Sequence, residues 1–162
     1  MIISSSRKPA DNTRIFCKNL SNTFGFKYIS RGKSSLRDLG LKSEELGFKY
    51  LCLIYELKGM PSKLSIFTND GKEKFSLKID AKTTSNRLHI KPKELKYKSI
   101  PKGLEFLNKY FDFDFDEKGF DNLIEINSSK DPEEIAIINF INDKGSKSEF
   151  EIKILDILYL DD

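Results

Sequence analysis

The sequence predicts an α/β fold in which helices pack on a β-sheet. Strand-like and helix-like segments alternate over the first 46 residues, and residues 50–57 form a near-continuous apolar run, typical of a strand covered on both faces. The chain of 162 residues has room for one domain, or for two small α/β halves that share a core.

The first four elements follow from apolar spacing and end signals. A strand is expected at residues 1–5, followed by a helix from Pro9 to Thr23, because proline suits a first helical turn and apolar residues then recur every four positions. Gly25 stands where a C-terminal cap is expected. Residues 26–30 are aromatic and β-branched and predict a second strand, and the leucines of residues 36–46 predict a second helix.

The middle of the chain predicts a strand and a hairpin. The apolar run Tyr50–Leu57 is interpreted as a central strand, and the Asp70-Gly71 turn between residues 64–68 and 75–79 is typical of a β-hairpin.

The remaining residues predict a Lys-rich crossing and a second set of elements. Residues 81–102 are Lys-rich and contain Pro92 and Pro101. This stretch divides the single domain of residues 1–162 into an N-terminal half at about 1–80 and a C-terminal half at about 101–162, with the crossing at about 81–100. The second half is expected to contain a helix at Pro101–Tyr110 and strands at 123–126, 135–141 and 150–160.

The formal net charge of +3 conceals a strong asymmetry along the chain. Residues 1–110 contain 23 Lys or Arg and 10 Asp or Glu, a charge of +13, whereas residues 111–162 contain 5 and 15, a charge of −10. A local field of this size indicates that the first two-thirds of the chain binds a polyanion. The acidic end is expected to face elsewhere.

The two cysteines, Cys17 and Cys52, lie in apolar segments and are expected to be buried, unpaired thiols of a cytoplasmic protein. No apolar run approaches the roughly 20 residues that span a bilayer. Residues 1–7 lack the pattern of a secretory signal. We therefore expect neither a membrane nor a secreted protein.

Two loops rich in serine and basic residues each follow a predicted strand and open a predicted helix. Free N–H groups at a helix start, together with hydroxyl groups and cations, favour phosphate binding. Arg14 and Lys18 extend the first loop along its helix, and Arg37 extends the second. The candidate RNA-binding residues are Ser5, Ser6, Arg7, Lys8, Arg14, Lys18, Arg31, Lys33, Ser34 and Arg37.

The alternative for these loops is that the serines only cap helices and the cations are solvated surface residues. Recurrence of the pattern within the strongly positive part of the chain favours nucleic-acid phosphate over capping alone. Parallel strands would bring both loops to one sheet edge, and both Arg7 and Arg31 are expected to face solvent.

No catalytic residue, metal site or cofactor is predicted. Asp112, Asp114 and Asp116 resemble the start of a calcium loop, but the glycine and the closing glutamate that such a loop requires are missing. Their alternation with phenylalanines indicates an extended segment with one apolar and one acidic face. His89 is the only histidine and has no ligand or triad partner at a suitable spacing.

The opening of the chain resembles the Brix domain, and in particular its short archaeal members. The resemblance rests on residues 3–9, on Thr13, Arg14, Phe16, Lys18 and Leu20 after them, and on Arg31, Gly32, Lys33, Leu36 and Arg37. Asn19 departs from the acidic residue expected before the leucine.

The resemblance implies an α/β fold of two similar halves, each a mixed sheet with packed helices like the anticodon-binding domain of class II aminoacyl-tRNA synthetases. It also implies a non-catalytic ribosome-biogenesis factor that binds precursor ribosomal RNA in rRNA processing or subunit assembly, with ribosomal or assembly proteins as further partners. Two alternatives stay open. One is an RNA-acting enzyme, and the other is a scaffold whose acidic C-terminal half recruits basic ribosomal proteins.

Overall fold

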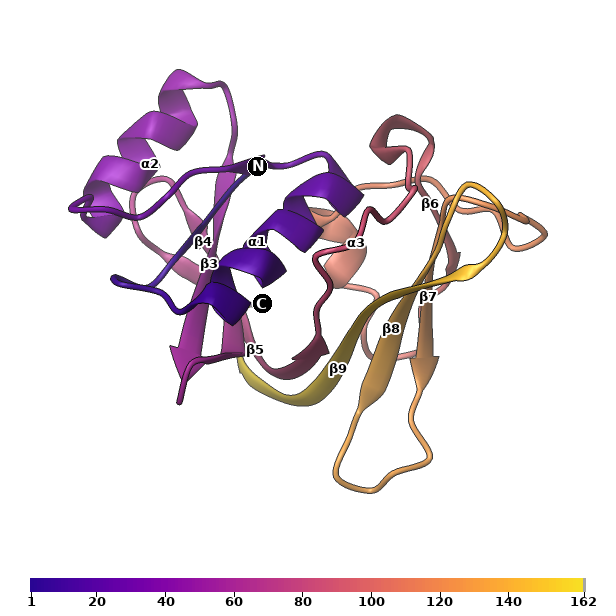
Figure 1. The fold of residues 1–162 in the computed structure, drawn as a ribbon. Helices are drawn as coiled ribbons and strands as arrows, with labels where there is room; N and C mark the ends of the chain where they lie inside the picture. Colours follow the sequence, from indigo (N-terminus) through magenta and orange to yellow (C-terminus); the bar gives the residue numbers. More distant parts are fainter. Residues whose placement is uncertain (162) are drawn as a thin grey trace.

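A computed structural model describes residues 1–161, which form a nine-stranded sheet with helices packed on it (Figure 1). The first part of the chain contains, in order, β1 (Ile2–Ser5), α1 (Asp11–Phe24), β2 (Lys27–Tyr28), α2 (Leu36–Glu45), β3 (Tyr50–Leu57), β4 (Met60–Thr68) and β5 (Glu73–Lys82). The second part contains the 3₁₀ turn η1 (Pro92–Glu94), β6 (Lys96–Ser99), α3 (Leu107–Tyr110), β7 (Leu123–Ser128), β8 (Ala136–Ile141) and β9 (Lys147–Leu160). No helix among these residues is long and apolar enough to cross a membrane.

The strand order is β2-β1-β3-β4-β5-β9-β8-β7-β6. β1 is parallel to β2 and β3, and β3, β4 and β5 are antiparallel neighbours. The second part repeats this arrangement, because β6 is parallel to β7 and β7, β8 and β9 are antiparallel neighbours. A parallel bridge from Tyr97 to Phe115 takes the place that β2 has beside β1. The predicted α/β class with two similar halves is confirmed, and the halves meet where β5 pairs with β9.

The helices lie on both faces of the sheet. α1 buries Phe16 and Leu20 in the larger core, which continues into the second half through residues such as Phe140. α2 packs Leu39 on the opposite face in a smaller cluster with Leu51. Helix amphipathicity explains this arrangement, since each helix can bury one apolar stripe only against the sheet.

Both cysteines lie in the larger core and are unpaired, as expected. Cys17 is 0% exposed and Cys52 is 1% exposed. Burial raises the pKa of the Cys17 thiol to about 12 and that of Cys52 well above its usual value.

The structure corrects the prediction for the start of the second half. The helix expected at Pro101–Tyr110 is wrong in extent, because α3 is a single turn at Leu107–Tyr110. Gly103 adopts a φ of +97°, outside the helical region, and residues before α3 form turns. β6 was not predicted, since only Tyr97 of its four residues is buried and the others are polar. The domain boundaries expected near residues 80 and 100 stay a prediction.

Candidate nucleic-acid interface

The carboxyl ends of β1, β2 and β3 lie at one edge of the sheet, on the left side of Figure 1. The Ser4 hydroxyl donates to the carbonyl of Ile29 at 2.6 Å, and the Ser6 N–H donates to the carbonyl of Ile54 at 2.8 Å. The β1–α1 loop (residues 6–10) and the β2–α2 loop (residues 29–35) therefore lie side by side. We refer to these two segments as the basic loops.

Arg31 joins the two basic loops. Its Nε donates to the carbonyl of Ser34 at 2.7 Å within its own loop. Its Nη1 donates to the carbonyl of Ser5 at 3.0 Å, and Ser5 is the last residue of β1, directly before the other loop. Arg31 is half-buried, which corrects the expectation that it faces solvent like Arg7. A planar guanidinium can make both bonds at once, so Arg31 fixes the relative position of the loops.

The other cations of the predicted set are exposed, but they do not all lie at this edge: three lie on the basic loops, one lies on the first turn of α2, and Arg14 and Lys18 lie along α1. Only Arg14 among them lies within 4.0 Å of a described carboxylate, that of Asp11 at 3.8 Å, and both of these side chains are more than half exposed. An exposed pair of this kind contributes little to stability. The exposed cations are Arg7, Lys8, Arg14, Lys18, Lys33 and Arg37.

The start of α1 is already bound to a carboxylate of the protein itself. Glu56, near the end of β3, accepts a hydrogen bond from the Ala10 N–H at 3.0 Å and one from the Thr13 hydroxyl at 2.5 Å. A carboxylate is favourable here because of the positive end of the helix dipole. The sequence-based expectation of free N–H groups at this helix start is therefore wrong for the Ala10 N–H.

The start of α2 is closed by a capping box. The Ser35 hydroxyl accepts from the Asp38 N–H at 3.0 Å, and the Asp38 carboxylate accepts from the Ser35 N–H at 2.9 Å. These hydrogen bonds lower the pKa of Asp38, and the charges of Arg37 and Arg7 lower it further. The interpretation that serines cap the helices thus holds for α2, through Ser35, and not for α1, whose N-cap Ala10 makes no side-chain cap hydrogen bond. An anion at this edge would be held mainly by side chains.

The three predicted serines differ in their availability. Ser5 is 0% exposed and its hydroxyl donates to the carbonyl of Ser6 at 2.8 Å. Ser6 and Ser34 are half-buried, and the Ser34 carbonyl is engaged by Arg31. Ser5 is therefore structural, and only Ser6 and Ser34 are positioned near the surface of the loops.

Sequence reasoning missed two residues of this edge, Glu56 and Lys58. Lys58 is exposed in the β3–β4 turn, and a Cβ on its neighbour Gly59 would lie 3.6 Å from the Cβ of Ala10. The signal was present, because β3 was predicted and a strand parallel to β1 must end at the same edge. What the residues did not indicate is that β3 pairs in parallel with β1.

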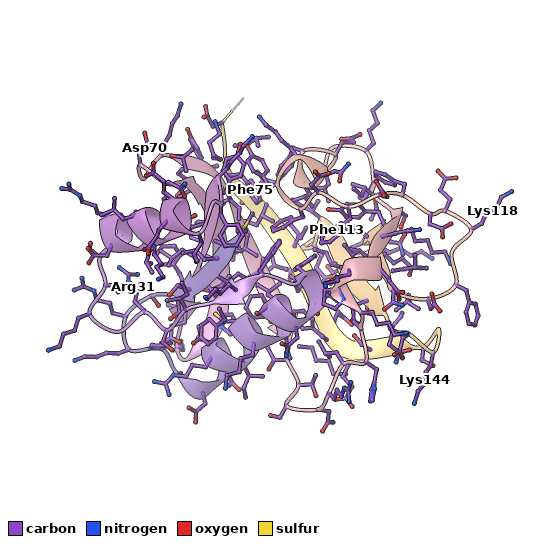
Figure 2. The ribbon with its side chains drawn as sticks, turned by 90° about the horizontal axis from the view of Figure 1, so that it is seen from above. Arg31, Asp70, Phe75, Phe113, Lys118 and Lys144 are labelled. Atoms are coloured by element: carbon purple, nitrogen blue, oxygen red, sulfur yellow. The ribbon has the colours of Figure 1, made fainter. Side chains whose placement is uncertain are left out.

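The acidic part of the chain lies away from the basic loops. Figure 2 places Arg31 at one end of the molecule and Lys118, which lies within the acidic run of residues 112–121, at the other. Phe111 is 8% exposed and Phe115 is 52% exposed, so the apolar face of the predicted extended segment is buried at its start and open at its end. In residues 1–161 no three His, Cys, Asp or Glu side chains are grouped so as to hold a metal ion.

The fold and this edge define an α/β protein of two similar halves with an exposed basic surface at the ends of parallel strands. In sequence it is similar to a probable Brix domain-containing ribosomal biogenesis protein of Methanothermobacter thermautotrophicus, with 26% identity over 96% of this chain and 97% of the relative. A relative of the same description from Methanococcus maripaludis is 34% identical over 51% of this chain and 47% of its own length. No protein-family model matches the sequence.

Solved structures agree with these sequence relatives. An archaeal Imp4-like protein superposes with a TM-score of 0.83 at 25% identity, covering 97% of this chain and 98% of the other. A probable ribosomal biogenesis protein from Aeropyrum pernix has the same fold, with a TM-score of 0.73 at 18% identity over 99% of this chain and 98% of the other. The resemblance to archaeal Brix proteins that was noted from the sequence is confirmed.

Proposed function

We propose that this protein is a non-catalytic ribosome-biogenesis factor that binds precursor ribosomal RNA through the basic loops. The observation that carries the proposal is the bridge made by Arg31, which holds two cation-bearing loops as one surface at a single sheet edge. The names of the relatives supply the choice of ribosome biogenesis. The charge of +13 over residues 1–110 supplies the choice of a polyanion.

The basic loops would contact the RNA backbone rather than read bases. Arg7 and Lys8 lie on one loop, Lys33 lies on the other, and Arg37 lies on the first turn of α2. Arginine binds phosphate oxygens with its planar fork, and lysine acts as a point charge. Arg31 would act as a positioning residue, because two of its donors are already used by backbone carbonyls.

Binding of a labelled precursor-rRNA fragment tests the proposal. We expect the intact chain to retain the RNA without cleaving it, with and without magnesium, and with a steep salt dependence. The variant Arg7→Ala with Lys33→Ala should flatten the log–log salt slope by about 1.4 to 1.8, since each lost phosphate contact removes about 0.7 to 0.9. Lys118→Ala with Lys130→Ala is the matched control, because it removes two exposed lysines elsewhere.

Three outcomes would contradict the proposal. New RNA fragments would favour the RNA-acting enzyme. Absence of binding would exclude RNA as the ligand. An equal slope for Arg7→Ala with Lys33→Ala and for the control would move the RNA contact away from the basic loops.

The scaffold for a basic protein is supported by one separate observation. Phe115 and Phe120 are 52% and 76% exposed within the acidic run of residues 112–121, and exposed aromatics are typical of protein contacts. Replacing the three aspartates of this run by asparagine should leave the affinity for RNA equal or higher, because their charge repels phosphate. The same change should weaken the binding of a basic protein partner. A large fall in RNA affinity with an intact fold would contradict this division. The three positions are Asp112, Asp114 and Asp116.

A further inference from the structure

The exposed face of α1 leads away from the basic loops toward the second half of the molecule. Arg14, Lys18 and Asn22 are exposed at four-residue spacing and therefore form one stripe along the helix. At 1.5 Å per residue the 14 residues of α1 extend about 21 Å. Figure 1 shows the crossing segment after β5 passing the far end of this helix.

The crossing segment is fixed to both halves of the protein. The side-chain amide of the buried Asn19 donates to the Thr84 carbonyl at 2.9 Å, and its oxygen accepts from the Thr84 N–H at 3.0 Å. Farther along, the carbonyl of His89 accepts from the N–H of Asp143 at 2.8 Å. His89 has a φ of +57°, a left-handed conformation uncommon for a residue with a side chain. Arg87 is thereby held between two anchored points.

Two surface grooves meet at Arg87 and His89. The first, of about 520 Å³, lies between these residues and the end of α1, where Ser21 and Asn22 line it. The second, of about 300 Å³, lies on the side of the second half, where Asn142 and Lys147 line it. Both grooves thus combine an exposed arginine with hydrogen-bonding side chains, and the first groove includes Asn22 of the stripe on α1.

The only carboxylate among the described residues lining the two grooves is Glu149. Its oxygens accept from the Thr84 hydroxyl at 2.7 Å and from the Asn86 side-chain amide at 3.2 Å. These hydrogen bonds lower the pKa of Glu149, so it stays ionised and serves to hold the crossing segment. Arg87 and Lys147 lie within 4.0 Å of no described carboxylate and are free for an outside anion.

We propose that the grooves around Arg87, His89 and Lys147 form a second backbone-binding site for single-stranded RNA, connected to the basic loops by the cationic stripe on α1. The proposal rests on the proposed RNA-binding function and extends it across the junction of the two halves. Arg87 and Lys147 would bind phosphates. The polar groups of Asn22, Asn86 and Asn142 would accept or donate hydrogen bonds to the sugar and phosphate groups.

A salt titration of RNA binding tests the second site. The probe is a fluorescein-labelled 16-nucleotide oligouridylate, and the readout is fluorescence anisotropy of the full chain. Arg87→Ala with Lys147→Ala should flatten the log–log slope by about 1.4 and weaken binding about 25-fold at 0.1 M salt, which is that slope change extrapolated from 1 M. The control variant, Lys118→Ala with Lys130→Ala, should change the salt slope and the affinity by only a small fraction of these amounts.

The combination of variants shows whether one RNA occupies both sites. If the basic loops and the second site contact the same strand, removing Arg7 and Lys33 together with Arg87 and Lys147 should lower the slope by the sum of the two separate losses. The second site would be overturned if the double variant of Arg87 and Lys147 had the same salt slope as the control variant of Lys118 and Lys130. In that case a flatter salt slope for Arg7→Ala with Lys33→Ala would still support the proposed function.

Two further outcomes separate the alternatives. Failure of the unmodified chain to bind the oligouridylate, while it still binds the precursor-rRNA fragment, would contradict the second site alone. Failure to bind either RNA would contradict the proposed function as well. Binding of a labelled 16-residue polyglutamate with the same affinity and the same loss in Arg87→Ala with Lys147→Ala would assign the grooves to an acidic protein, and would overturn the RNA assignment.

Discussion

Replacement of Arg31 should destabilise the protein, although an exposed arginine in a loop would not. Hydrogen bonds from a charged donor contribute about 1.5 to 3 kcal/mol each, and Arg31 makes two such bonds to the carbonyls of Ser34 and Ser5. Because the side chain is half-buried, water replaces part of what Arg31→Ala removes, so we expect a loss of about 2 kcal/mol. For a chain of this length that corresponds to a fall in Tm of about 4 to 8 °C.

The variant Arg31→Lys separates the contribution of the two hydrogen bonds to stability from that of the positive charge. A lysine ammonium keeps the positive charge but lacks the planar fork, so it retains at most one of the two bonds and should lose about 1 kcal/mol. Arg7→Ala is the control, since Arg7 is exposed and should change stability by less than about 0.5 kcal/mol.

Urea unfolding at pH 7, followed by circular dichroism, measures these differences. The midpoint should fall in the order Arg7→Ala, Arg31→Lys, Arg31→Ala with an unchanged m value. RNA affinity should fall further for Arg31→Ala than for Arg7→Ala, because the basic loops lose their common position. An Arg31→Ala variant as stable as Arg7→Ala would refute the bridging role.

Three other changes test the fold around the candidate interface. Glu56→Ala should cost about 1 to 2 kcal/mol in urea unfolding, because it removes the acceptor at the start of α1. Gly40→Ala should cost about 3 kcal/mol in thermal unfolding, since a Cβ there would lie 1.9 Å from the carbonyl oxygen of Asn69, and an unchanged Tm would contradict this packing. The thiols of Cys17 and Cys52 should react with an aqueous reagent only as fast as the protein unfolds, whereas labelling within seconds in native buffer would contradict their burial.

Elements with strong local signals could be predicted from the sequence. Both end residues of β3, Tyr50 and Leu57, were predicted correctly, because a buried central strand is apolar throughout and polar residues flank it. The start of the second half could not be predicted in the same way. Tyr97 is buried in the larger core, between Ile124 of β7 on one side and Phe115, 18 positions away, on the other. Neither Tyr97 nor Phe115 lies in an apolar run.

The candidate interface was predictable in its location and not in its chemistry. Parallel strands end at one edge, so the clustering of cations from two loops follows from the predicted order strand, helix, strand, helix. The position of Glu56 does not follow, since its partner Thr13 is 43 residues away. The same holds for the bond from Arg31 to Ser5, which spans 26 residues and depends on the side-chain rotamer.

The central pairing of β5 with β9 has a consequence for synthesis on the ribosome. β1 to β5 pair only with one another apart from this one seam, so they can assemble as soon as β5 has emerged. The open side of β5, with Leu77 and Ile79, must then wait for β9, which ends 78 residues later. At about 5 to 20 residues per second this takes roughly 4 to 16 s. During that interval the nascent chain presents an unpaired apolar strand edge, the kind that aggregates, and ribosome pausing within residues 83–146 would lengthen the exposure.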